Sequence, residues 1–243
     1  MKKILVSLLL CLVVVPAAAF DITPFATQAN SYFEPLVDMF ATGVNSGLAA
    51  ATIPGKFLSV GFQANLAINP EEDVLAQAQN SDNYIFPIFF ATLRIDDFLI
   101  FGRGLVVNQK GLDFWYAGGG IGYIVADYKP LFPQIRILGA YHILDSGDDA
   151  YFKVATATVN VIGDYKLPIP LFDLHILGNL AYERNMLTTD WKNVISQPEK
   201  DFGVNRVRAS VGFQVGFLAF LNVSYEYTIL PSPNHNFGLS ASF

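Results

Sequence analysis

Apolar and polar residues alternate along most of the chain after residue 57. The clearest stretch is 58–69, where every second residue is apolar and the residues between them are polar or small. Because the side chains of a β-strand point alternately to two opposite faces, this pattern predicts a strand with one apolar and one polar face. The same pattern recurs in five further stretches: 134–142, 174–183, 206–215, 221–229 and 235–243.

Four other stretches are less regular, with apolar residues on both faces or glycines where polar side chains are expected: 86–96, 98–107, 113–126 and 151–163. Together these stretches make ten predicted strands of about ten residues, the length that crosses a bilayer in a tilted strand. We therefore predict an all-β fold, a transmembrane antiparallel β-barrel of about ten strands, with eight or twelve as alternatives. Long or polar links are expected at its extracellular end: 69–85, 108–112, 145–150, 185–203 and 230–234. Tighter turns are expected at its periplasmic end: Asp96-Asp97, 127–133, 164–171 and the region around Phe217.

A different periodicity precedes the first strand. Thr23-Pro24 is typical of a helix start, and apolar residues then recur three and four positions apart up to Val44. This predicts an amphipathic helix, bent or restarted at Pro35 and ended by Gly43 or Gly47. Such a helix could plug the lumen, close the periplasmic mouth or lie on the membrane surface. Since it carries acidic residues and no lysine or arginine, we expect a plug or lid, with a stripe of Phe33, Leu36, Phe40 and Val44 resting on the glycine-rich wall at 118–122.

The N-terminus has the features of an export signal. Lys2 and Lys3 precede an apolar run that ends at Ala17-Ala18-Ala19, so residues 1–19 are predicted to be a cleaved signal peptide. Residues 20–56 then form the helical segment and 57–243 the barrel. The single cysteine, Cys11, lies in the predicted signal peptide, which leaves the mature chain without disulfide or thiol chemistry.

Composition supports a membrane barrel. Hydrophobic residues make up 52% of the chain and charged residues only 15%, below the roughly 25% usual for soluble domains. The apolar run in the signal is too short for a spanning helix, and closed barrels are the other way to satisfy backbone groups across a bilayer. Without the signal, 13 basic residues face 21 acidic ones, which excludes nucleic acid as an expected partner.

Charged and histidine side chains fall on the predicted inner faces. The candidate lumen or constriction residues are Arg94, Arg136, His142, His175, Glu183, Arg206, Arg208 and Glu226. They could set an ion-selective constriction or tie opposite walls together, and in a barrel this narrow we favour ties. No sequence motif of a hydrolase or metalloprotease accompanies the histidines, so no catalytic residue, metal site or cofactor is expected.

The last nine residues alternate and end on an aromatic side chain. Phe237, Leu239 and Phe243 resemble the terminal signal that the barrel assembly machinery recognises in Gram-negative outer-membrane barrels. Residues 32–38 and 43–47, followed by the strand at Leu58, resemble an uncharacterised family of small bacterial outer-membrane barrels with an N-terminal helix. This resemblance implies the fold and an outer-membrane location but no activity. The layout is also loosely similar to the long-chain fatty-acid transporter superfamily, whose barrels are about twice as large.

Three functional hypotheses follow. The first is a non-enzymatic outer-membrane barrel that passes a small or hydrophobic molecule past its helix, or that has a structural role in the membrane. The second is a surface-loop binding or adhesion protein anchored by the barrel. The third, a soluble periplasmic barrel, is disfavoured because the charged residues share one face of the strands. The expected partners are outer-membrane lipid, the barrel assembly machinery and a small or hydrophobic ligand; the oligomeric state stays open.

Overall fold

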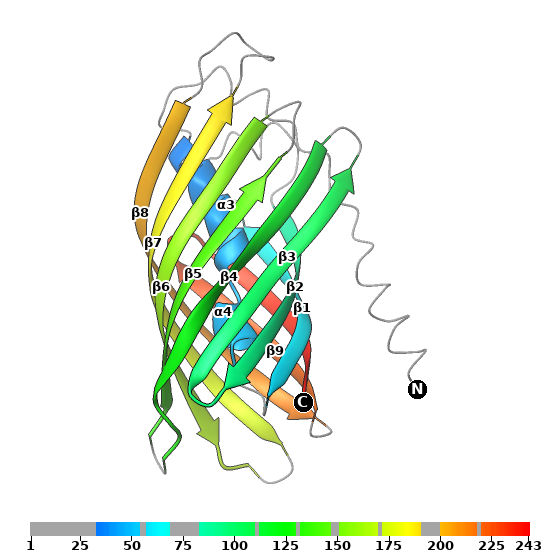
Figure 1. Cartoon of the computed structure of the whole chain (residues 1–243), viewed down its shortest axis with the longest axis vertical. Helices are drawn as coiled ribbons and strands as arrows, with labels where there is room; N and C mark the ends of the chain where they lie inside the picture. The colour runs from blue at the N-terminus through cyan, green and yellow to red at the C-terminus, as the bar shows by residue number, and fades with distance from the viewer. Residues whose placement is uncertain are drawn as a thin grey trace.

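The structure, a computed structural model, describes residues 33–53, 57–68, 83–109, 112–129, 132–146, 151–169, 172–190, 200–217 and 220–243. These residues form ten strands around two short helices, α3 (Phe33–Asn45) and α4 (Leu48–Ala51) (Figure 1). The strands are β1 (Leu58–Ile68), β2 (Asn83–Ile95), β3 (Phe98–Gln109), β4 (Leu112–Ala126), β5 (Gln134–Asp145), β6 (Tyr151–Leu167), β7 (Asp173–Asp190), β8 (Lys200–Phe217), β9 (Leu221–Leu230) and β10 (Asn234–Ser242).

Each strand pairs antiparallel with its neighbours in the chain, and β1 closes the barrel against β10. At the closure the Phe243 backbone N–H donates to the Leu58 carbonyl at 2.8 Å, and the Phe57 N–H donates to the Phe243 carbonyl at the same distance. Closure leaves no free edge, as a sheet in a bilayer requires. The prediction of a ten-stranded antiparallel barrel preceded by a short helix is confirmed.

The predicted bounds were wrong at one long link. The chain pairs β7 with β8 as far as Asn185↔Val204 and Thr189↔Lys200, within the range 185–203 that was expected to be a loop. Residues 185–188 continue the alternation, since Asn185 and Leu187 are buried and Met186 is exposed. The polar residues at both ends of this region suggested a loop. Backbone hydrogen bonds between strands do not depend on apolar side chains, so the strands continue there.

The two helices lie inside the barrel (Figure 1). We call residues 33–53 the lumen segment, because they contact strands on opposite sides of the barrel. The segment runs from the end of the barrel where β1 leads toward β2 to the end of the short turns. Its direction follows from β1, where Asn65 bonds Gly43 and Gln63 bonds Gly47, and from Thr92 near the β2–β3 turn, which bonds Ala51.

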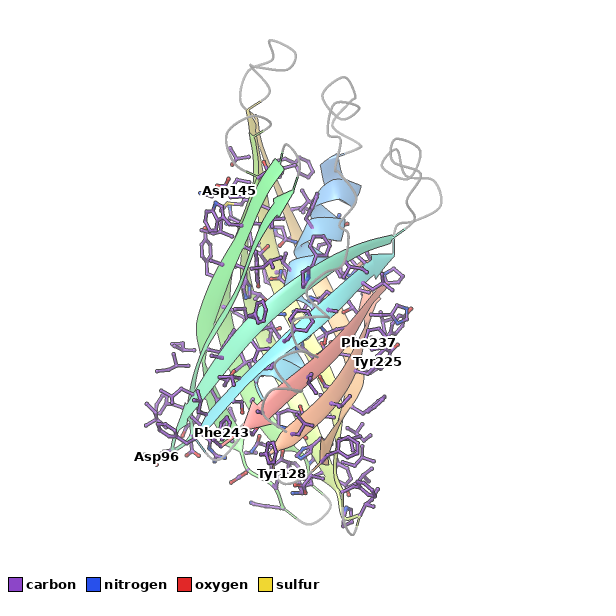
Figure 2. All side chains as sticks on the ribbon, turned by 90° about the vertical axis from the view of Figure 1, so that its right-hand side faces the viewer. Asp96, Tyr128, Asp145, Tyr225, Phe237 and Phe243 are labelled. Carbon is purple, nitrogen blue, oxygen red and sulfur yellow. The ribbon has the colours of Figure 1, made fainter. Side chains whose placement is uncertain are left out.

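The outer face of the barrel is apolar and the inner face is largely polar. Buried and exposed residues alternate along β5 and along the middle of β7. Figure 2 shows Phe237 and Tyr225 on the outside, and Asp96, Tyr128 and Phe243 toward the short-turn end, with Asp145 toward the other. Exposed apolar side chains form the outward belt: Phe89, Ile100, Ile121, Val159, Leu180, Val207, Val211, Phe213 and Phe237. This is the pattern of a barrel that faces lipid outside and a polar lumen inside.

No helix in the described ranges is long and apolar enough to cross a membrane.

Candidate functional site in the barrel lumen

Apolar side chains pack around α4 in the half of the lumen nearest the short turns. Leu48, Ala49 and Ala50 of α4 and the following Ile53 pack against inward-facing side chains of five strands. Those wall residues are Leu99, Phe101, Ile124, Leu138, Ile162 and Leu177. Three of the four strands predicted with apolar residues on both faces contribute to this cluster, because their inner faces meet a helix there. The cluster surrounds α4 on the sides of these five strands.

Charged side chains bind both ends of α4. A carboxylate oxygen of Glu226 accepts the Ala50 backbone N–H at 3.4 Å near the start of the helix. At its end the Arg136 guanidinium, fully buried, donates to the carbonyls of Thr52 and Ala49. A carboxylate at a helix start and a cation at its end both complement the helix dipole and satisfy backbone groups that the helix leaves unpaired. Two of the predicted lumen residues therefore hold α4.

The β1–β4 side of the lumen binds α3 through its carbonyl groups. Arg103 donates to the carbonyls of Val44 at 3.0 Å and Ser46 at 2.6 Å. The Tyr116 hydroxyl donates to the same Val44 carbonyl at 3.0 Å. Asn65 donates to the carbonyls of Gly43 and Ser46, and Gln63 to that of Gly47. These bonds satisfy the carbonyls that an α-helix exposes at its C-terminal end.

A glycine turn joins the two helices. Gly47 has a φ of 78°, and a Cβ there would stand 2.5 Å from the Asn236 side-chain nitrogen. Only glycine combines a positive φ with such a close approach to the wall. The sequence prediction of a helix end at Gly43 or Gly47 is thus fulfilled by Gly47, one residue beyond Ser46.

On the β7–β9 side, ion pairs and hydroxyl groups contact the lumen segment. Arg206 donates to Asp38 of α3 at 2.8 Å, with both side chains partly exposed. The hydroxyls of Ser46 and Thr228 lie 3.0 Å apart. Below them, buried Arg208 donates to Glu183 at 2.6 Å and to Asn160 at 3.1 Å. Arg206 thus reaches the helix, whereas Arg208 and Glu183 tie β8 to β7 within the wall.

His142 and Val44 both contact Tyr116. The His142 ring stacks on Tyr116 with centroids 5.7 Å apart, and Tyr116 is the residue that bonds Val44. Both His142 nitrogens are buried without a hydrogen-bond partner in the described part of the chain. A Cβ on Gly118 would stand 1.9 Å from the His142 ring. The absence of a side chain at Gly118 therefore makes the space in which the ring lies.

A second polar cluster closes the short-turn end between β4, β5, β6 and β7. Asp164 accepts hydrogen bonds from Tyr128 and contacts the His175 Nδ1 at 2.8 Å, and the Arg136 guanidinium lies 3.9 Å away. Burial and the nearby Asp164 carboxylate raise the pKa of Tyr128, which lies in the β4–β5 turn. Hydrogen bonds from the Gln134 side chain and the Tyr128 N–H lower the pKa of the Asp127 carboxyl in that turn. The cluster fastens this turn to Arg136 and hence to α4.

The remaining predicted lumen residue, Arg94, lies at the rim. It is half-buried, and its Nε donates to the Asp96 carbonyl in the β2–β3 turn at 2.8 Å. The structure thus brings Arg136, Asp164 and His175 together at one end, Glu183 and Arg208 together in the wall, and Arg206 against α3. Arg94 joins none of these groups.

The predicted stripe on the helix is only partly placed. The side chains of Phe33 and Leu36 lie outside the described residues, while Phe40 and Val44 are buried. Phe40 packs edge-on against Phe86 of β2, with ring centroids 5.9 Å apart. Whether the whole stripe rests on the glycines at 118–122 stays a prediction. Side chains of the wall lie close to three of those glycines, because a Cβ on Gly118, Gly120 or Gly122 would stand within 3 Å of His142, Phe101 or Leu138, respectively.

Sequence patterns missed the side chains that hold α3. Gln63, Asn65, Arg103 and Tyr116 are all buried and all bond the lumen segment. Arg103 had a signal: it stands between Gly102 and Gly104 in an otherwise apolar strand. A lone cation in such a strand has to find acceptors in the interior.

At the C-terminus, Phe237 and Phe243 are exposed on the outside and Leu239 is partly exposed. Their position on the lipid-facing side of β10 and at its end leaves them accessible to a protein partner or lipid. Recognition by the assembly machinery stays a prediction.

No group of three or more histidine, cysteine, aspartate or glutamate side chains able to hold a metal ion occurs among the described residues.

Comparison with known proteins identifies no family. No family model matches the chain, and no curated protein matches it either. Among solved structures, the attachment invasion locus protein Ail of Yersinia pestis has 13% identity and a TM-score of 0.32, covering 76% of this chain and 95% of its own. The β domain of the Bordetella autotransporter BrkA has 11% identity and a TM-score of 0.31, covering 76% of this chain and 98% of its own. The monoaromatic hydrocarbon channel CymD has 11% identity and a TM-score of 0.29, covering 84% of this chain and 93% of its own. At these scores the likeness defines neither a family nor an activity, and the resemblance to a family of small barrels stays an expectation.

Proposed function

We propose that this chain is a non-enzymatic barrel of the bacterial outer membrane through which a small solute passes when the lumen segment moves. The observation that carries the proposal is the apolar packing around α4. A four-residue helix fills the short-turn end of the lumen with apolar contacts, although the wall around it is complete without it. A barrel of ten strands has room inside for side chains and one small ligand, which suits a narrow gated passage better than a general pore.

The contacts that hold the lumen segment are suited to release. Apart from the Asp38–Arg206 pair, wall side chains reach it mainly through backbone carbonyls and N–H groups, which water also satisfies when the segment moves. The strands themselves are closed by continuous backbone pairing. The segment can therefore shift without opening the wall.

The location in this proposal rests on the predicted signal peptide, the apolar outward belt and the terminal aromatic residue. Lipid of the outer membrane and the barrel assembly machinery are the partners that these features imply. The competing proposal is a barrel that stays closed and anchors binding or adhesion loops. It is favoured by the buried Glu183–Arg208 pair, which makes that wall rigid.

A reversible crosslink separates the two proposals. Because the hydroxyls of Ser46 and Thr228 lie 3.0 Å apart, the variant Ser46→Cys/Thr228→Cys can form a disulfide that fixes the lumen segment to β9. We expect conductance events in planar bilayers to disappear when this variant is oxidised and to return after reduction. The purified mature chain, inserted as an assembled barrel, is used for each measurement.

The matched control places the same bond within the wall. The hydroxyls of Ser59 and Ser242 also lie 3.0 Å apart, but they join β1 to β10. Oxidation of Ser59→Cys/Ser242→Cys should leave conductance unchanged. Equal conductance of the oxidised and reduced Ser46→Cys/Thr228→Cys protein, or no conductance in any assembled form, would reject the gated passage in favour of the anchor.

A further inference from the structure

Three arginines from three different strands donate hydrogen bonds to the lumen segment at successive positions. In the order of the segment, the bonds are those of Arg206 to Asp38, of Arg103 to Val44 and Ser46, and of Arg136 to Ala49 and Thr52. The helical rise of about 1.5 Å per residue places Asp38 about 9 Å from Val44 along α3. The three guanidinium groups therefore follow one another along the lumen.

Each of these arginines bonds a negative part of the segment. Asp38 presents a carboxylate to Arg206. Arg103 meets carbonyl groups at the C-terminal end of α3, and Arg136 meets those at the C-terminal end of α4. The C-terminal end of a helix carries partial negative charge, because its last carbonyl groups have no partner within the helix. The segment thus supplies oxygen acceptors to all three guanidinium groups.

The wall itself carries more guanidinium groups than carboxylates. Apart from the exposed Lys166–Asp173 pair at the rim, the charged side chains that face the lumen from the described strands are Arg94, Arg103, Arg136, Arg206, Arg208, Asp164, Glu183 and Glu226. Glu183 accepts from Arg208, and Glu226 accepts from Ser210, each at 2.6 Å. Arg103 forms no ion pair with a carboxylate among the described residues. The excess positive charge of the wall therefore faces the lumen segment.

We propose that the passage conducts small carboxylate anions, which replace the acceptors of the lumen segment at Arg206, Arg103 and Arg136 as the segment moves. The inference rests on the proposed passage function and names the class of solute that it carries. A guanidinium group presents planar N–H donors that match the two oxygens of a carboxylate. The Asp38 carboxylate already occupies one of these positions. Cations offer no acceptor to these donors, and the positive wall repels them.

Room for the solute comes from displacement of the segment. Arg103 is 4% exposed and Arg136 is fully buried, so both are covered in the closed barrel. The Arg206 side chain is 22% exposed, and Asp38 beside it is also partly exposed. An anion therefore meets Arg206 first and competes there with Asp38. The deeper arginines become accessible only as the segment withdraws.

The ion selectivity of the conductance tests the proposal. The assembled mature chain is placed in a planar bilayer under a gradient of potassium acetate, and the reversal potential gives the permeability ratio of acetate to potassium. We expect acetate to be about tenfold more permeable, because one unpaired guanidinium charge in a narrow lumen changes the energy of an ion by about that factor. Equal permeabilities, or a preference for potassium, would overturn the proposal.

Two variants break the same ion pair from opposite sides. Asp38→Asn removes the carboxylate of the segment, and Arg206→Gln removes the guanidinium of the wall. If Arg206 only ties the segment to β8, both variants give the same permeability ratio. If Arg206 also selects the solute, Asp38→Asn gives more frequent conductance events at an unchanged ratio, whereas Arg206→Gln lowers the ratio about threefold. Equal ratios in the two variants would reject a role of Arg206 in selection.

Arg103→Gln tests the buried level. The change keeps an N–H donor for the carbonyls of α3 and removes the charge. We expect the acetate ratio to fall, whereas Arg184→Gln, which removes the same charge from an exposed position of β7, should leave it unchanged. The migration of each variant in unheated detergent gels verifies that its barrel has assembled. An unchanged ratio in assembled Arg103→Gln would contradict the proposal, and the Arg206 and Asp38 variants decide it if Arg103→Gln does not assemble.

Selection and passage fail separately in these measurements. Conductance without a preference for acetate would keep the passage and reject the anion as its solute. No conductance in the mature chain or in the reduced Ser46→Cys/Thr228→Cys protein would reject the passage itself, and with it the transport of carboxylates.

Discussion

The two sides of the lumen differ in how their buried polar side chains are hydrogen-bonded. On the β1–β4 side, buried Gln63, Asn65, Arg103 and Tyr116 each donate a hydrogen bond to a carbonyl of the lumen segment. On the β5–β7 side, His142, Thr156 and Asn185 are buried to the same degree, and their polar atoms have no partner in the described residues.

The difference shows that burial and polarity do not reveal what a lumen residue does. Paired side chains on the first side stabilise the position of the lumen segment, because they satisfy carbonyls at the end of α3. The lumen segment is thus bonded to the β1–β4 wall and, through Arg206 and Thr228, to β8 and β9, whereas the buried polar groups at β5–β7 gain no hydrogen bond from the described residues.

The largest effect is expected from Arg103→Met. The change removes hydrogen bonds to Val44, Ser46 and Gln63 and leaves carbonyls unsatisfied in the interior. We expect the free energy of unfolding to fall by about 3 kcal/mol, measured by guanidinium unfolding of the barrel in lipid vesicles. The control Arg184→Met, at an exposed position of β7, should change it by less than about 0.5 kcal/mol. Equal effects of the two variants would remove the distinction between the walls.

A smaller loss is expected from Gly118→Ala. The new Cβ would stand 1.9 Å from the His142 ring, so the ring must move, at a cost of about 2 kcal/mol. Gly139→Ala is the matched control, because a Cβ there meets nothing within 4 Å. Unfolding midpoints and the His142 imidazole signals are measured for both. An unshifted His142 signal in Gly118→Ala would show that the ring is not held against β4.

The smallest effect concerns Tyr128, in the turn that joins the two walls. Its pKa is raised, so the folded state holds the phenol proton more tightly than the unfolded chain does. Its contribution to stability is therefore complete below about pH 10, the ordinary pKa of tyrosine, and declines as the pH rises further. Wild-type melting temperature should fall more steeply above pH 10 than that of Tyr128→Phe, which should be less stable by about 1 kcal/mol at pH 7. Parallel curves for the two proteins would contradict this role.

The barrel was predictable because its cause is local. Alternation within 58–69 or 221–229 reflects the two environments of a strand, lipid and lumen, and each strand shows it by itself. The terminal helix was predictable for the same reason, from its apolar spacing and Gly47. The strand pairing within 185–203 was harder to predict from the sequence. Polar strand ends form the same backbone hydrogen bonds as apolar ones, but they show no alternation of apolar residues.

Within the candidate site, the sequence predicted which charged residues lie on the inner face. It did not predict which groups they bond. Arg136 and Arg208 are both arginines at inward-facing strand positions. Yet Arg136 donates to carbonyls of α4 and its C-cap, and Arg208 donates to Glu183 of the neighbouring strand. Strands with apolar residues on both faces were visible in the sequence. The inner apolar face of these strands packs on α4. The sequence of a single strand cannot predict this contact, because it depends on where the helix lies.

The sequence alone determined a closed barrel with a helix before it, because periodicity encodes which face of each element meets lipid, lumen or protein. Only the tertiary structure decided that the helix lies inside the lumen, that α4 packs against five strands, and that Arg103 bonds the lumen segment while neither His142 nitrogen has a partner among the described residues. Hydrogen bonds between residues such as Arg103 and Val44 join elements far apart in the chain. The geometry of these bonds depends on the register of the strands and on the position of the helix along the lumen. The local pattern of residues determines neither.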